Sequence, residues 1–139
     1  MAAQLSKETI IERDLLRQIA ECRRDDARSL ARAGRYAAAV YLGGYAVECA
    51  LKVSICKILD LEALPRTFAV HDLDVLLMHS GLKRRLSQEQ GVAQSFRKLA
   101  EVWKSGSRYD DPAMITQSEM EGFLAWVDEV LTWLNDRAS

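Results

Sequence analysis

The side chains best suited to proton transfer near neutral pH are two histidines, His71 and His79. An imidazole ring titrates close to physiological pH, so it can take a proton from one group and return it to another. His79 stands near the end of a short predicted helix, just before Gly81. A histidine at that place is typical of a surface charge that interacts with the end of the helix. His71 stands at the start of the same helix.

The three cysteines, Cys22, Cys49 and Cys56, do not form an evident chemical site. Their number is odd, their spacing is not that of metal ligands, and the last two fall within a helical pattern. We expect buried free thiols. This usage favours a reducing cytoplasm. No metal or other cofactor is predicted.

The composition indicates one compact domain, residues 1–139. Hydrophobic residues make up 49% and charged residues 28% of the 139 positions, which is ordinary for a globular chain. The net charge of −1 gives no general attraction to nucleic acid or to an anionic membrane, so any RNA contact must be local. Charged residues such as Lys7 and Glu8 interrupt any signal peptide, and we expect no membrane span.

Apolar residues at helical spacing predict an all-α, up-and-down bundle of about five helices. The first helix is expected from an N-cap at Ser6 to Gly34. Its polar face is rich in arginine and basic on balance. We expect this face to be an ordinary solvated surface, and an RNA-contacting stripe is the alternative.

The second predicted helix, residues 35–59, is the centre of the domain. Its many small side chains, alanines and the pair Gly43 and Gly44, allow neighbouring helices to approach its backbone closely. Each glycine lowers helix stability by about 1 kcal/mol relative to alanine, and we expect close packing to compensate for this cost. Glu48 and Lys52 are spaced for an ion pair worth a few tenths of a kcal/mol. Three tyrosines on this helix are expected in the core or an interface: Tyr36, Tyr41 and Tyr45.

The remaining segments alternate between loops and shorter helices. Residues 60–70 read as a loop, and the short helix after His71 stops at Gly81. Ser87 with Gln90, and Ser118 with Glu121, have the spacing of capping boxes at the starts of the last two helices. No alternation favours a sheet.

Four pieces of the chain, in order, resemble HEPN domains ("higher eukaryotes and prokaryotes nucleotide-binding"). The longest is Gly34-Arg-Tyr-Ala-Ala-Ala-Val-Tyr-Leu-Gly-Gly-Tyr-Ala-Val-Glu-Cys-Ala-Leu-Lys52. The others are Asp26-Ala27 with Leu30, His71-Asp72-Leu73 with Leu76-Leu77, and Trp103 with Arg108-Tyr109. The set is similar to the branch of the family that is associated with minimal nucleotidyltransferases.

The resemblance implies a helical, dimeric or higher oligomeric protein that acts as the RNase toxin of a toxin–antitoxin pair and has a nucleotidyltransferase partner. Active members carry an Arg four to six residues before a His, and Arg66-Thr-Phe-Ala-Val-His71 matches that spacing, with Thr67 where Asn is frequent. The implied catalytic pair is Arg66, which would contact phosphate oxygens, and His71, which would transfer protons. Arg108 and Tyr109 are the implied substrate-binding residues.

A non-catalytic function is the alternative hypothesis to the RNase activity. His71 opens a helix, where its ring can cap or pack, and the Arg108-Tyr109 pair suits a structural corner as well as a phosphate site. The protein would then be a binding module that docks a nucleotidyltransferase or a nucleotide.

Overall fold

The computed structural model describes residues 11–103 and 114–138. Six α-helices make up most of these residues, which confirms the predicted all-α bundle. They are α2 (Arg13–Arg32), α3 (Tyr36–Ile58), α4 (Leu73–His79), α5 (Lys83–Ser87), α6 (Gln90–Val102) and α7 (Gln117–Ala138). A 3-10 turn, η1 (Arg66–Phe68), and two short strands lie in the connections.

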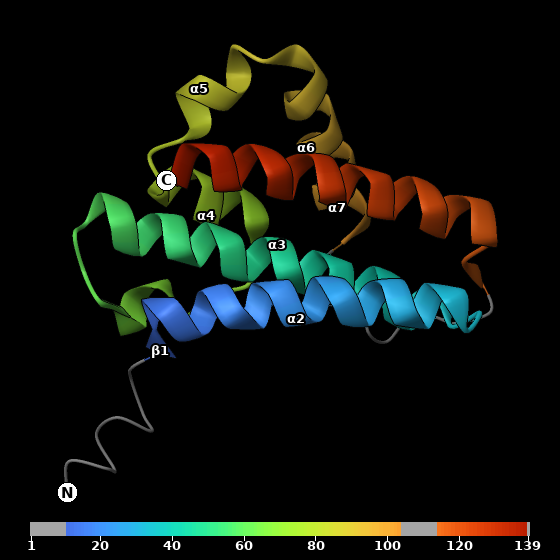
Figure 1. Ribbon diagram of the computed structural model, residues 1–139. Helices are drawn as coiled ribbons and strands as arrows, with labels where there is room; N and C mark the ends of the chain where they lie inside the picture. The colour runs from blue at the N-terminus through green and yellow to red at the C-terminus, as the bar shows by residue number, and fades with distance from the viewer. Residues whose placement is uncertain (1–10, 104–113, 139) are drawn as a thin grey trace, which may run out of the picture.

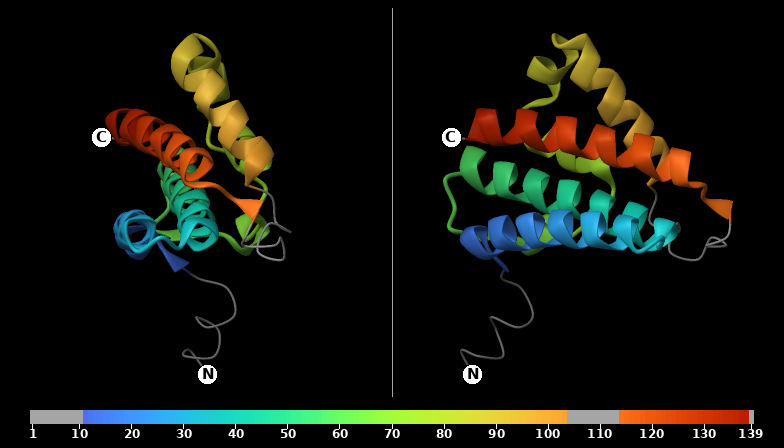
Figure 2. Two further views of the ribbon diagram at one scale, coloured as in Figure 1. Left: turned by 90° about the vertical axis from the view of Figure 1, so that its right-hand side faces the viewer. Right: turned by 45° about the vertical axis from the view of Figure 1, so that its right-hand side comes forward.

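The three long helices run side by side, with α3 between α2 and α7 (Figure 1). The shorter helices complete the bundle on the other sides of these three. α4 packs against α3, while α5 and α6 rise beside α7, as two further views show (Figure 2). Because α3 contacts α2, α4 and α7, its side chains form the middle of the core.

α3 matches the predicted 35–59 helix to within one residue at each end. It is buried around most of its circumference, since 15 of its 23 residues are inaccessible. By length and composition α3 could cross a bilayer, but 83% of its most apolar stretch is buried inside the bundle. Its apolar character is therefore that of a core helix.

The two adjacent glycines of α3 permit the close approach that the sequence predicted. A Cβ atom on Gly44 would lie 2.1 Å from the Trp103 ring, and one on Gly43 would lie 2.9 Å from the Leu124 side chain. The Trp103 indole N–H also donates a hydrogen bond to the Tyr41 carbonyl at 2.9 Å. Gly44 thus makes room for an aromatic ring that is anchored on the backbone of α3.

The helix ends agree only partly with the predictions. Gly34 and Gly81 have positive φ angles of 77° and 78° and follow α2 and α4, as expected of glycines that end helices. Ser87 does not cap the next helix. Its hydroxyl donates to the Arg84 carbonyl at 2.6 Å, and α6 begins after Glu89 without a side-chain cap.

The capping box of the last helix lies two residues earlier than predicted. The Thr116 hydroxyl accepts from the Glu119 N–H, and the Glu119 carboxylate accepts from the Thr116 N–H, both at 3.1 Å. Ser118 and Glu121 have the same spacing, but Thr116 precedes the first helical residue, where an N-cap must lie.

The first helix also starts later than predicted. Residues before 11 are not described, and β1 (Ile11–Glu12) pairs antiparallel with β2 (Ala63–Leu64) before α2 begins at Arg13. Two-residue strands are too short to leave an alternating pattern in the sequence. This pairing holds the start of α2 against the segment that leads to His71.

Candidate functional site

His71 is the sequence-predicted site residue that the structure places in a defined contact. It lies between η1 and α4, and its Nδ1 atom is 3.0 Å from the Oε2 atom of Glu48 on α3. The His71 side chain is 61% exposed, whereas that of Glu48 is only 3% exposed. One edge of the imidazole is therefore anchored on the core, and the rest of the ring faces solvent.

Lys52 completes the anchor. Its Nζ atom donates to the same Oε2 atom of Glu48 at 2.8 Å, one helical turn away, and its side chain is 7% exposed. A carboxylate paired with an ammonium group can only accept hydrogen bonds, so the His71 Nδ1 atom must be the donor. In the neutral ring this leaves Nε2 with the lone pair that can accept a proton. We call Glu48, Lys52 and His71 the buried-charge cluster.

Asp72, and not His71, caps α4. The Asp72 Oδ1 atom accepts from the N–H groups of Asp74 at 2.9 Å and Val75 at 3.2 Å. Leu73, on the first turn of α4, is buried in the core and fixes this end of the helix against α3. Of the two alternatives left open for His71, capping the helix is therefore wrong.

A pocket of about 530 Å³ opens beside His71, within the size range of small-molecule sites. It is lined by residues of the connection to α4, of the first turn of α4, and of the end of α6 with the residue after it: Val70, His71, Asp72, Leu73, Asp74, Ala100 and Trp103. The imidazole thus meets a space large enough for part of a substrate. Two acidic residues share that lining, so a phosphate bound there needs a cation from elsewhere.

Arg66, the other member of the predicted catalytic pair, has no described contact with His71. Arg66 is exposed on η1, and its guanidinium makes no hydrogen bond or ion pair within residues 11–103 and 114–138. Arg108 and Tyr109 lie outside the described residues. Only the histidine of the predicted catalytic pair is therefore part of a preformed arrangement.

Sequence reasoning did not identify Glu48 and Lys52 as site residues. It predicted their ion pair but assigned it the small energy of an exposed helical pair, whereas both side chains are buried. The sequence signal for a buried ion pair was a pair of opposite charges, four residues apart, in the middle of an otherwise apolar stretch. The contact of Glu48 with His71 joins positions 23 residues apart and depends on how α4 packs.

The arginines of α2 form the solvated surface that was expected. Four of the six arginines lie in ion pairs with carboxylates of the same helix or of α7. The ion pairs are Arg17–Asp14, Arg23–Asp26, Arg28–Asp25, Arg24–Asp128 and Arg28–Asp128. A stripe whose charges are compensated in this way offers little excess charge to RNA.

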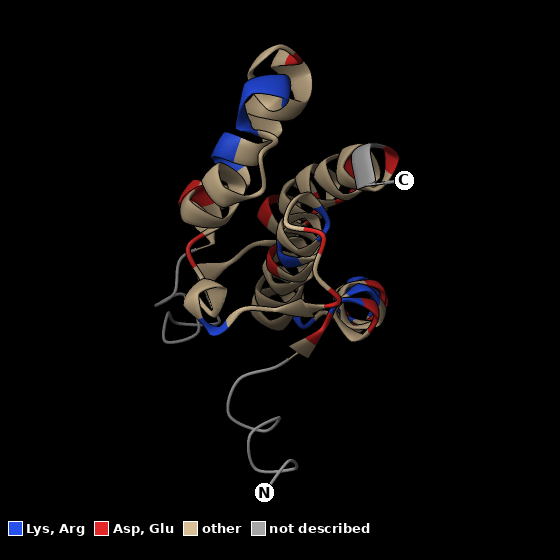
Figure 3. Cartoon of the chain, turned by 90° about the vertical axis from the view of Figure 1, so that its left-hand side faces the viewer, with Lys and Arg blue, Asp and Glu red and all other residues tan. Residues whose placement is uncertain are grey.

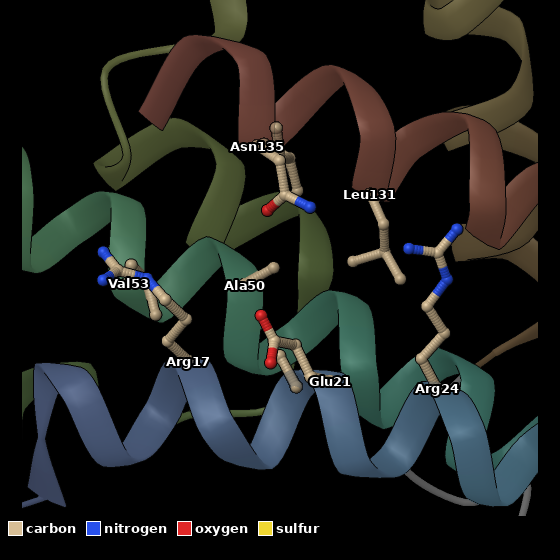
Figure 4. Close-up of a pocket in the computed structure, with 9 residues that line it drawn as sticks. Arg17, Glu21, Arg24, Ala50, Val53, Leu131 and Asn135 are labelled. Carbon is tan, nitrogen blue, oxygen red and sulfur yellow. The ribbon is translucent and has the colours of Figure 1, made fainter. Parts of the chain in front are cut away.

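A second pocket lies between α2 and α7, with Ala50 of α3 at its floor (Figure 4). Arg17, Glu21 and Arg24 come from α2, and Asn135 comes from α7. Its volume of about 40 Å³ suits a water molecule and is far below that of ordinary ligand sites. It shares no lining residue with the pocket beside His71.

The cysteines are free, but only two of the three are buried. Cys49 and Cys56 lie in the core, and burial, the largest cause, raises the pKa of the Cys49 thiol to about 12, with nearby Glu48 adding to the shift. Cys22 is exposed on α2, so its predicted burial is wrong. The helical spacing of Cys22 was correct, but its position falls at the solvent edge of the apolar face.

The three tyrosines of α3 are half-buried, as expected of residues at the edge of a core. Tyr36 and Tyr45 pack against the core, and the Tyr41 ring lies 6.2 Å from the Trp103 ring. His79 is exposed at the end of α4, as predicted. The centroids of the His79 and Phe68 rings are 5.2 Å apart, in an edge-to-face arrangement. Of the aromatic residues in these contacts, Trp103 lines the pocket beside His71, and the three tyrosines, Phe68 and His79 do not.

Comparison with known proteins identifies the family of this helical bundle. A family model described as the HEPN domain matches residues 13–137. The crystal structure of an archaeal HEPN homologue is similar over 93% of this chain and 99% of that chain, with a TM-score of 0.66 and 18% sequence identity, a level that supports the fold. No curated protein matches the sequence. Because the family model spans nearly all of the described helices, the chain belongs to the HEPN domain family.

Proposed function

We propose that this protein is a metal-independent endoribonuclease that cleaves single-stranded RNA as a dimer and serves as the toxin of a toxin–antitoxin pair. The observation that carries the proposal is the His71–Glu48 contact at 3.0 Å, which fixes an exposed imidazole beside an open pocket. A buried carboxylate that holds one ring nitrogen and leaves the other free is an arrangement that suits acid–base catalysis.

In the proposed reaction the RNA 2′-oxygen attacks the adjacent phosphorus while the bond to the 5′-oxygen of the next nucleotide breaks. The His71 Nε2 atom accepts the 2′-hydroxyl proton. A protonated His71 from a second copy of the chain supplies a proton to the departing oxygen. The products are a 2′,3′-cyclic phosphate and a 5′-hydroxyl. One chain carries one such histidine, so the acid and base roles require two copies across a two-fold interface.

Arg66 supplies the positive charge in this proposal. Its exposed guanidinium lies five residues before His71 and has no competing partner among the described residues. A bidentate contact with two phosphate oxygens would offset the acidic lining of the pocket and stabilise the charge that develops in the transition state. Arg108 and Tyr109 are proposed as further substrate contacts.

The two histidines provide a matched test. Purified wild-type, His71→Ala, His79→Ala and Arg66→Ala proteins are incubated with a labelled single-stranded RNA in the presence of EDTA. Loss of an acid–base group costs about 10²–10⁴-fold in rate, so His71→Ala and Arg66→Ala should lose at least 100-fold while His79→Ala keeps the wild-type rate. Equal rates for His71→Ala and His79→Ala would overturn the proposal.

The acidic lining of the pocket favours one second candidate. Asp72 and Asp74 stand beside His71, and a phosphate is repelled there unless Arg66 reaches it. In the second candidate the protein is a non-catalytic module that docks a nucleotidyltransferase. Absence of cleavage by the wild type, together with a stable complex with such a partner by light scattering, would favour this candidate.

A further inference from the structure

Positive charge is concentrated in one short part of the chain. Residues 82–98 contain five basic residues and a single acidic one, Glu89, so this segment has a net charge of +4. Because the whole chain has a net charge of −1, the remaining residues carry −5. The segment forms α5 and α6, and Figure 3 shows Lys and Arg gathered on these helices at the top of the view.

The basic residues of α5 all face outward. Leu82 is half-buried and Leu86 is buried, and residues four apart lie on the same side of a helix. Of the three residues between them, Arg84 lies on the opposite side and Lys83 and Arg85 lie on the flanks, and each is exposed. Arg97 is exposed on α6, whereas Lys98 lies over the Trp126 ring of α7. We call Lys83, Arg84, Arg85 and Arg97 the α5–α6 basic surface.

These four side chains differ from the arginines of α2 in having no acidic partners. In the part of the chain that the structure describes, none of them forms an ion pair or a side-chain hydrogen bond. On α2, by contrast, four of the arginines are paired with aspartates. Unpaired cations attract a polyanion, because binding releases its condensed counterions at no cost in broken ion pairs.

The α5–α6 basic surface also lies within reach of His71. Two extended residues lead from His71 to α4, the seven residues of α4 rise about 10 Å, and four more reach Lys83, so the two positions are at most about 30 Å apart. An RNA strand of several nucleotides can span such a distance. An RNA strand bound to this surface would therefore be held close to the pocket that His71 lines together with Asp72 and Asp74.

We propose that the α5–α6 basic surface binds the phosphate backbone of single-stranded RNA without regard to sequence. This proposal rests on the proposed function for its ligand and adds the surface that holds the strand. No aromatic residue belongs to the surface, so the contacts are to phosphates and carry no base preference. The surface provides the local positive charge that the chain as a whole lacks.

The test measures binding apart from cleavage. A fluorescein-labelled 20-nucleotide oligouridine is titrated with protein between 0.05 and 0.5 M salt, with anisotropy as the readout, in the His71→Ala background. The variant carries Lys83→Gln, Arg84→Gln and Arg85→Gln. The matched control carries Arg17→Gln, Arg23→Gln and Arg28→Gln on α2, which changes the net charge by the same amount. Circular dichroism confirms that each variant is folded.

Removing three phosphate contacts should reduce the slope of log affinity against log salt by about 2. At 0.1 M salt this corresponds to roughly 100-fold weaker binding. The α2 control should stay within about threefold of its parent, because its arginines are already compensated.

Equal losses in the two triple variants would overturn the proposal, since they would show an effect of net charge alone. Binding of vesicles with 30% anionic lipid, without binding of the oligouridine, would also overturn it. Failure here is distinguishable from failure of the proposed function. If His71→Ala abolishes cleavage while the α5 variant binds RNA normally, the catalytic proposal stands and only the surface is wrong.

Discussion

α2 and α3 lie side by side and have similar lengths, yet they differ in the number and the burial of their charged residues. α2 has ten charged residues among 20, and its ion pairs lie at the surface. α3 has three among 23, and two of these, Glu48 and Lys52, are buried with one another. Exposed pairs are weak and interchangeable, while a buried pair is held in one geometry. Only the charge on α3 can therefore fix the orientation of a neighbouring side chain.

Thiol reactivity should show the largest difference between the two helices. Cys22 is exposed on α2, and Cys49 is buried on α3 with a thiol pKa raised to about 12. At pH 8 only roughly one Cys49 thiol in 10⁴ would be ionised, so iodoacetamide should modify Cys22 at least 1,000-fold faster in the folded protein. Mass spectrometry of peptides after timed quenching measures both rates. Comparable rates would contradict the burial of Cys49.

The same pKa shift predicts how stability varies at high pH. Because the folded state favours the protonated Cys49 thiol, its contribution is fully present below the ordinary pKa of a thiol and is lost as pH rises toward about 12. The difference in unfolding free energy between wild type and Cys49→Ala should therefore shrink above about pH 9. A difference that is constant to pH 11 would contradict this.

Lys52→Met tests the buried pair itself. It leaves the Glu48 charge in the core without its cation, which should lower the free energy of unfolding by about 3–5 kcal/mol in urea titrations. Lys57→Met is the matched control, since Lys57 is half-buried on the same helix and makes no ion pair with a described residue. Equal losses for the two variants would show that Glu48 does not depend on Lys52.

Gly44→Ala tests the close packing of α3. The added Cβ atom would meet the Trp103 ring at 2.1 Å, and overpacking of this kind costs about 1–3 kcal/mol. At Gly122 of α7 a Cβ atom meets nothing within 4 Å, so Gly122→Ala should stabilise by up to about 1 kcal/mol through helix propensity. Thermal unfolding of both variants gives the comparison. The same sign for both would contradict the account.

Asp128→Asn should have the smallest effect on stability. It removes the negative charge shared by Arg24 and Arg28 and keeps an acceptor oxygen. Because the Asp128 side chain is 43% exposed, the loss should be below about 1 kcal/mol and should decrease with added salt. Urea unfolding at 0.05 and 0.5 M salt measures both features. A salt-independent loss above 2 kcal/mol would mean that α2 and α3 do not differ as described.

The sequence predicted the parts of the fold that depend on local patterns. The long central helix, its glycine-mediated packing and the glycines at positions 34 and 81 follow from helical spacing and backbone preference. Capping boxes were harder, because Ser118 with Glu121 and Thr116 with Glu119 have the same local chemistry. Only the position of the first helical residue distinguishes them.

The site was predicted less completely than the fold. His71 could be singled out through the family resemblance, but its anchor could not, because the contact with Glu48 depends on how α4 docks on α3. The sequence does show that α2 has aspartates near its arginines and that α5 has none. Only the structure shows that Asp128, 100 residues away from Arg28, adds an ion pair to both Arg24 and Arg28.

The central claim is that the buried carboxylate of Glu48 sets the orientation and tautomer of His71. Long-range ¹H–¹⁵N correlation spectra of ¹⁵N-labelled protein above the histidine pKa distinguish the two ring nitrogens directly. His71 should carry its proton on Nδ1, and this preference should be lost in Glu48→Gln, with His79 unchanged in both proteins. A proton on the Nε2 atom of neutral His71 in the wild type would show that Glu48 does not set the tautomer of His71.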